Sequence, residues 1–208
     1  MLTVTDTGGG AEFKKLDPGT YAAVCTQIID IGPQVTPWGE SNKIKIRFEV
    51  PSERAEWQDS DGQSHEGPMV IWASYTASLS EKANLRKDLE SWRGRAFTPE
   101  ELKGFDITKI LGQPCMISVK HKTSQTNGKT YANIASISRL VKGMETPKAE
   151  GDLIAFDIDN HTREQYDALP EWLQKLVSEG LKLKAEQSDR VYDERNPPDD
   201  FENTDIPF

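Results

Sequence analysis

The sequence predicts a mainly β domain in which three strands, a helical insertion and two closing strands follow one another. Three observations support this. Apolar and polar residues alternate in the first third of the chain, the apolar spacing becomes helical around Leu85, and alternation returns after Gln113. Turn residues separate these segments. We expect the domain to span residues 19–143, after a flexible leader at residues 1–18.

The first three strands are expected at residues 20–31, 43–50 and 70–77. The first is rich in β-branched and aromatic residues and lies between Pro18-Gly19 and Gly32-Pro33. The second alternates cleanly, so it should have an apolar face and a wet face; the apolar face carries Ile44, Ile46, Phe48 and Val50, and the wet face carries Lys43, Lys45, Arg47 and Glu49. The third has Trp72 and Tyr75 on opposite sides, so at least one of them should belong to the core.

Helical signals follow the third strand. Ser78-Leu79-Ser80-Glu81 has the form of a capping box, and Leu85, Leu89 and Trp92 then recur at helical spacing up to Gly94. A second short helix is expected at Thr98-Pro99-Glu100-Glu101, which has proline at the first helical position. Two more strands are expected at 113–122 and 129–142, joined by a polar loop with hairpin composition.

This element order is that of a five-stranded OB-fold-like barrel, in which a helix lies between strands three and four. A small β-sandwich with an inserted helix would give a similar order, so both architectures stay open. Cys25 and Cys115 lie in apolar runs, and we expect them to be core residues in a reducing compartment. Because no segment has the form of a signal peptide or a membrane span, we expect a cytoplasmic protein.

The composition turns acidic after Gly143. Up to that residue there are 18 Lys and Arg against 17 Asp and Glu, whereas from Met144 onward there are 7 against 17, so the net charge of −9 comes from the C-terminal part. We expect an acidic linker over 144–184 that contains a short amphipathic helix from Asp167 to Gly180. This helix should pack on the barrel rather than on a partner or a second subunit. Residues 185–208 are expected to be disordered.

The last ten residues combine acidic charge with an apolar tip. We expect them to capture a partner protein through Asp199, Asp200, Asp205, Ile206, Pro207 and Phe208. Pro207 restricts the conformations that docking must order, and a pocket with a basic rim would suit both the carboxylates and the two apolar side chains. The alternative is a solubilising tail with a chance ending.

Cationic and aromatic residues gather on the expected strands and turns. Single-stranded nucleic acid is bound by cations along its phosphates and by rings on which its bases stack. The candidate DNA-binding residues are Trp38, Lys43, Lys45, Arg47, Trp72, Tyr75, Lys120, Lys122, Lys129, Tyr131 and Arg139. Of Trp72 and Tyr75 we expect only one to touch DNA. Alternating lysines on a strand are also typical of an ordinary solvated face.

The terminal Asp205-Ile206-Pro207-Phe208 resembles the tip of bacterial and phage single-stranded DNA-binding proteins, although Asn203 and Thr204 interrupt the run of aspartates usual there. Together with the barrel order and the basic strands, the chain resembles the phage-type members of this family. The resemblance implies sequence-independent binding and protection of single-stranded DNA in replication, recombination or repair, in the host cytoplasm if the chain is phage-encoded. It also implies recruitment of replication proteins by the tail, and homo-oligomers are possible.

Two other function classes remain open. A replication or recombination adaptor could use the same tail while its barrel binds protein. A metal-dependent nuclease could use Asp157 and Asp159, with Asp152 nearby, although a solvated acidic run explains these residues more simply. The three histidines lack metal-ligand spacing, and no phosphate loop or nucleophile elbow is present. We therefore expect no catalytic residues, no metal and no cofactor.

Overall fold

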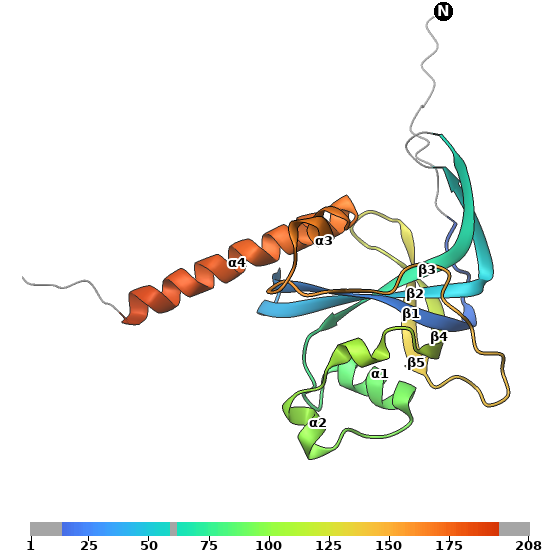
Figure 1. The fold of residues 1–208 in the computed structure, drawn as a ribbon, viewed down its shortest axis with the longest axis horizontal. Helices are drawn as coiled ribbons and strands as arrows, with labels where there is room; N and C mark the ends of the chain where they lie inside the picture. The colour runs from blue at the N-terminus through green and yellow to red at the C-terminus, as the bar shows by residue number, and fades with distance from the viewer. Residues whose placement is uncertain (1–13, 59–61, 196–208) are drawn as a thin grey trace, which may run out of the picture.

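The computed structural model describes residues 14–58 and 62–195. Within these ranges the chain folds around a curled antiparallel sheet (Figure 1). Its strands are β1 (Gly19–Thr36), β2 (Gly39–Gln58), β3 (Ser64–Thr76), β4 (Pro114–Thr123) and β5 (Thr130–Ser138). The neighbouring strands follow the order β3-β2-β1-β4-β5, so β1 is central and pairs with both β2 and β4. The mainly β fold with a helical insertion after β3 is confirmed.

The concave side of this sheet encloses the larger core. The apolar face expected for β2 points into it, with Ile44, Ile46, Phe48 and Val50 all buried. Helix α1 (Asn84–Arg93) adds Leu85, Leu89 and Trp92 to the same core. Trp92 donates its indole N–H to the Pro114 carbonyl oxygen at 2.8 Å, which anchors α1 to the start of β4. Cys25 and Cys115 are buried and unpaired, as the sequence predicts for core residues.

The helix boundaries after β3 differ partly from those expected. The Ser78 capping box is wrong, because α1 begins at Asn84, and its N-cap Ala83 offers no side-chain cap. Its end is confirmed, since Gly94 adopts a left-handed conformation with φ of 68°. The second capping box is confirmed in α2 (Pro99–Lys103), where Thr98 and Glu101 cap each other. A 3-10 turn, η1 (Ile107–Ile110), then leads into β4.

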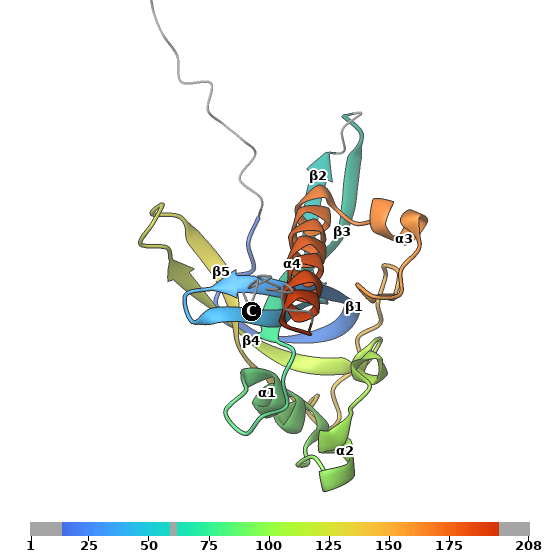
Figure 2. The same cartoon turned by 90° about the vertical axis from the view of Figure 1, so that its left-hand side faces the viewer.

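A second, smaller core lies on the other side of β1. Strand β6 (Ile154–Phe156) pairs in parallel with β1 at Gln27–Ile29, just beyond the residues of β1 that pair with β4. Helices α3 (Arg163–Asp167) and α4 (Glu171–Arg195) follow. Leu173 and Val177 of α4 are fully buried against Ile29 and Ile31 of β1. Figure 2 shows helix α4 alongside β1. The expectation that this amphipathic helix packs on the barrel is confirmed.

The expected end of that helix at Gly180 is wrong, and the expected disorder is wrong over residues 185–195, because α4 continues to Arg195. Gly180 permits a close approach to β1 instead of ending the helix: a β-carbon there would lie 2.1 Å from the Ile31 carbonyl oxygen. The residues after it include Leu, Lys, Ala, Glu and Gln, which favour helix, and no proline occurs before Pro197. Helix α4 therefore runs past the sheet (Figure 1).

Two other boundaries need correction. β1 continues through Gly32-Pro33 to Thr36, with an irregular register between Asp30 and Gly32 that accommodates the turn residues. Leu16, which we assigned to the leader, is buried in the larger core, and its carbonyl oxygen lies 2.8 Å from Nε2 of His121. The packed domain therefore begins before Gly19. Residues 1–13 and the acidic tail 196–208, with its expected partner-binding tip, lie outside the described residues.

None of the helices in the described ranges combines the length and the hydrophobicity needed to cross a bilayer.

Candidate nucleic-acid interface

The outer face of β2 carries the row of cations identified in the sequence. Lys43 donates to the Thr76 hydroxyl of β3 at 2.7 Å. Lys45 is partly buried, and this burial lowers the pKa of its ammonium group. Lys43 and Arg47 are partly buried as well. The three cations therefore share one face, and none of them is fully exposed to solvent.

Arg47 is engaged in an ion pair within the protein. Its Nη1 lies 3.2 Å from Oε1 of Glu49, which is only 1% exposed, and 3.5 Å from the Thr26 hydroxyl. Burial lowers the pKa of Arg47, and the Glu49 carboxylate opposes that shift. The expectation that the polar face of β2 is solvated throughout is thus wrong at Glu49. Its other carboxylate oxygen accepts hydrogen bonds from the backbone N–H groups of Glu150 and Gly151. Through these hydrogen bonds, the segment after β5 that contains Glu150 and Gly151 is held against the outer face of β2 at Glu49.

Trp172 of α4 covers the middle of the face. Its ring lies edge-on to Trp72 with the ring centroids 5.2 Å apart, and Nζ of Lys45 is 5.8 Å from the Trp172 centroid. Trp172 itself remains 43% exposed. A partly desolvated ammonium beside two indole rings can engage a phosphate and a base together. The sequence indicated Trp172 only as part of a packing helix.

Trp38 is the most exposed large apolar side chain among those described, at 92%. It lies in the two-residue turn between β1 and β2, where Thr36 pairs with Gly39 and the Thr36 hydroxyl accepts the Trp38 backbone N–H at 3.3 Å. Gly39 has a φ of 105°, which favours glycine. This hydrogen-bonded turn thus presents an indole ring with little of its surface covered by protein.

The hairpin of β4 and β5 carries a second group of candidates. Lys122 is opposite Tyr131 in the strand register, and Lys120 and Lys129 are exposed on the same hairpin. Tyr131 is exposed, and its hydroxyl accepts a hydrogen bond from the Asn127 side chain at 2.9 Å. This bond fixes the ring beside the loop, so the hairpin presents three lysines around one positioned aromatic ring.

Tyr75 and Trp72 lie on opposite faces of β3, as expected. Tyr75 is only 8% exposed, and its hydroxyl donates to the Asp88 carboxylate at 2.7 Å. Burial is the main cause of a raised pKa at both Tyr75 and Asp88. Tyr75 is therefore the core member of the pair, and Trp72 is the one whose ring reaches the outer face.

A groove of about 570 Å³ runs between β3 and β5 beside the N-terminal half of α1. Lys45, Trp72 and Ser74 line one wall, and Asn133 and Ala135 of β5 line the other. The groove therefore joins the outer face of β2 and β3 to β5, the second strand of the lysine-bearing hairpin. Arg139, the remaining candidate, lies elsewhere, in a cleft at the other end of α1.

Two carboxylates considered for metal binding, those of Asp157 and Asp159, both make contacts within the protein. Asp157 accepts the Asp159 backbone N–H at 2.9 Å, and the Asp159 carboxylate pairs with Lys184 at 2.5 Å. Within residues 14–58 and 62–195, no group of three or more metal-binding side chains comes together. These aspartates position the turn between β6 and α3.

A scan against protein-family models finds no match for the chain. A search of curated proteins finds no similar sequence either.

Proposed function

We propose that the protein binds single-stranded nucleic acid, most directly single-stranded DNA, without sequence preference, through an OB-type barrel. The observation that carries the proposal is the strand order β3-β2-β1-β4-β5 with a helix between β3 and β4. In OB barrels the ligand lies on the face of strands two and three and between the 1–2 and 4–5 loops. Trp38 lies in the turn between β1 and β2, Lys45 lies on β2, and Tyr131 lies at the start of β5 beside the β4–β5 loop, which supports the proposal.

The chemistry of these places supports the same function. The exposed Trp38 ring offers a stacking surface, and stacking on an aromatic ring depends little on base identity. The lysines of β2 and of the β4–β5 hairpin would follow the phosphates. The negative total charge does not oppose this, because the excess of acidic residues lies after Gly143.

The acidic C-terminal segment would serve recruitment. Removing residues 199–208 should leave DNA affinity unchanged or raise it, because the segment's carboxylates compete with phosphates for the cations. The same truncation, or Phe208→Ala alone, should abolish capture of replication proteins in a pull-down. A large loss of DNA affinity on truncation would contradict this division of roles.

Trp38→Ala provides the sharpest test of the face. Loss of one stacked base costs about 1–3 kcal/mol, which corresponds to about 5- to 150-fold weaker binding of a fluorescent oligothymidylate in an anisotropy titration. Trp57→Ala is the matched control, because Trp57 lies at the opposite end of β2 and stacks on His65. Equal losses in both variants, or none in Trp38→Ala, would count against this face.

The rival functions predict different results. An adaptor whose barrel binds protein would bind the oligonucleotide only substoichiometrically. A nuclease would degrade single strands faster when a divalent metal is added.

A further inference from the structure

A second cleft, of about 800 Å³, lies at the C-terminal end of α1, between α2, η1 and the segment that follows β5. Five cations line it, against a single carboxylate, that of Glu101. The cations, which define what we call the basic cleft, are Arg93, Arg95, Lys109, Arg139 and Lys142. They come from several separate segments, and four of the five were not among the residues identified in the sequence.

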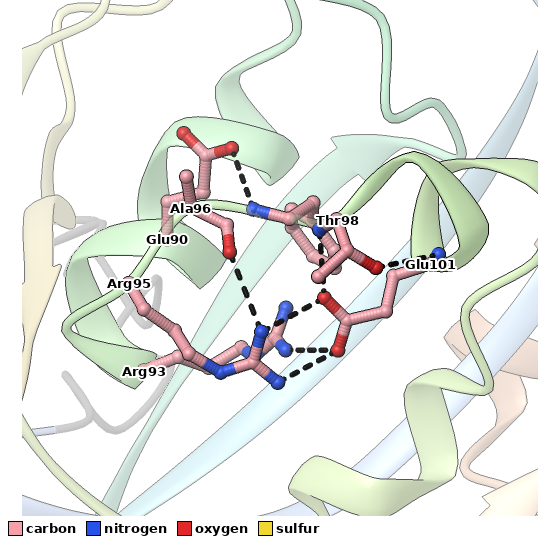
Figure 3. Close-up of polar contacts among 7 residues, drawn as sticks. Glu90, Arg93, Arg95, Ala96, Thr98 and Glu101 are labelled. Atoms are coloured by element: carbon pink, nitrogen blue, oxygen red, sulfur yellow. Dashed lines mark hydrogen bonds and ion pairs between the residues drawn. The ribbon is translucent and has the colours of Figure 1, made fainter.

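Glu101 fixes two of these cations in place (Figure 3). Its carboxylate oxygens accept from both terminal nitrogens of Arg95 at 2.7 and 2.9 Å, and one of them also accepts from Arg93. The Arg93 guanidinium lies over the Phe97 and Phe105 rings at 4.4 and 5.0 Å. Glu90 is a second acidic neighbour of Arg93, but it forms its ion pair with Arg86. Two carboxylates therefore face three guanidinium groups, and this part of the cleft keeps a positive charge.

The other three cations are exposed. Arg139 lies directly against the left-handed Gly94, where a β-carbon would be 3.5 Å from its Nη1. Lys109 has the Asp106 carboxylate as its acidic neighbour. Among the described residues, Arg139 and Lys142 form no ion pair with a carboxylate. The basic cleft therefore presents cations that the fold does not neutralise.

We propose that the basic cleft binds the phosphates of a nucleic acid strand that continues past α1 from the groove between β3 and β5. This inference rests on the proposed function. Both sites border α1 and the same stretch of chain: Asn133–Ala135 line the groove, and Arg139 and Lys142 line the cleft. The ten residues of α1 span about 15 Å, so an extended nucleic acid strand that leaves the groove has only about this distance to cover before it reaches the basic cleft.

The cleft is suited to a sugar-phosphate backbone rather than to bases. Its aromatic residues, Trp92 and Phe105, are covered by packing and offer no open ring, unlike Trp38. Arginine forks match phosphate oxygens. An acidic peptide would meet the same charges, but the continuity with the groove favours a linear polyanion that already occupies β2 and β3.

The test compares oligothymidylates of about 8 and about 16 nucleotides, both within the range covered by OB barrels. The double variant Lys109→Gln/Lys142→Gln removes two exposed cations. For the longer oligonucleotide, the slope of log K against log salt should become shallower by about 1.4, or about 0.7 for each phosphate that is no longer neutralised. Binding of the shorter one, held by the strand face, should stay the same. Lys175→Gln/Lys182→Gln on the exposed side of α4 is the charge-matched control.

Three results would overturn the inference. An unchanged slope for the longer oligonucleotide would exclude the cleft and leave the proposed function standing. If the unaltered protein bound neither oligonucleotide, both proposals would fail. If a labelled peptide of residues 199–208 bound the unaltered protein but not the double variant, while the longer oligonucleotide bound both equally, the cleft would belong to an acidic peptide.

Discussion

Gly180→Ala tests how closely α4 packs on the sheet. In an ordinary helix interior this change stabilises a protein, since alanine is favoured over glycine by about 1 kcal/mol. Here the added β-carbon would lie 2.1 Å from the Ile31 carbonyl oxygen and 3.2 Å from the Ile158 side chain. The nearest atom belongs to the backbone of central strand β1, so the helix must shift away from it. We therefore expect Gly180→Ala to destabilise the protein instead of stabilising it.

The size of the effect follows from the packing. Overpacking of a buried site costs about 1–3 kcal/mol. Because the clash is with backbone, we take the upper part of this range, about 2–3 kcal/mol, and subtract the roughly 1 kcal/mol by which a helix favours alanine. A net loss of about 1–2 kcal/mol, at about 2–4 °C in Tm per kcal/mol for a protein of this length, should lower Tm by about 2–8 °C. Tm would be measured by circular dichroism, with the exposed neighbour Glu179→Ala as control. An unchanged or higher Tm for Gly180→Ala would show that α4 does not approach β1 as described.

Two further predictions concern buried and capping carboxylates. Glu49→Ala should lower the free energy of unfolding, measured in urea, by about 2–4 kcal/mol. The change leaves Arg47 and two backbone N–H groups of the linker without their acceptor. Glu56→Ala, at an exposed position of the same strand, is the control and should change the free energy of unfolding little. The hydrogen bond from Arg95, followed by those from Thr98 and Arg93, lowers the pKa of Glu101 from 4.5 to about 2. The stability that this carboxylate adds is present above pH 4.5 and is lost as the pH falls toward 2. In Glu101→Gln, the urea concentration at the unfolding midpoint should therefore depend less on pH between 4.5 and 2. A pH dependence parallel to that of the unaltered protein would contradict the pairing.

The sequence predicted the sheet well where one face of a strand is apolar. The alternation at Ile44, Ile46, Phe48 and Val50 identified the inward face of β2, because a strand with one buried side must keep a period of two. The capping box at Thr98 and Glu101 is also local, so it could be found from neighbouring residues alone.

Features that depend on tertiary contact could not be found in this way. Gly180 has the form of a helix stop, but its role comes from β1, which is distant in sequence. Burial of Glu49 in an otherwise polar face depends on the linker returning to it. Trp172 reaches the candidate face only because α4 crosses the outer side of β1.

The candidate site was predicted unevenly for the same reason. Exposed residues in turns, such as Trp38, are recognisable because turns lie at the surface. The basic cleft combines segments that are far apart in sequence, so Arg139 alone among its cations could be predicted. The run Arg93-Gly94-Arg95 was the one local signal that could have indicated it.

Salt dependence of binding to single-stranded DNA tests the central claim most directly. A fluorescent oligothymidylate would be titrated with the full chain at several salt concentrations, with a duplex of equal length as control. We predict tight binding in dilute buffer, a linear fall of log K with log salt at about 0.7 per phosphate neutralised, and weaker binding of the duplex. Absence of binding to the single strand at low salt, or an affinity indifferent to salt, would contradict the account.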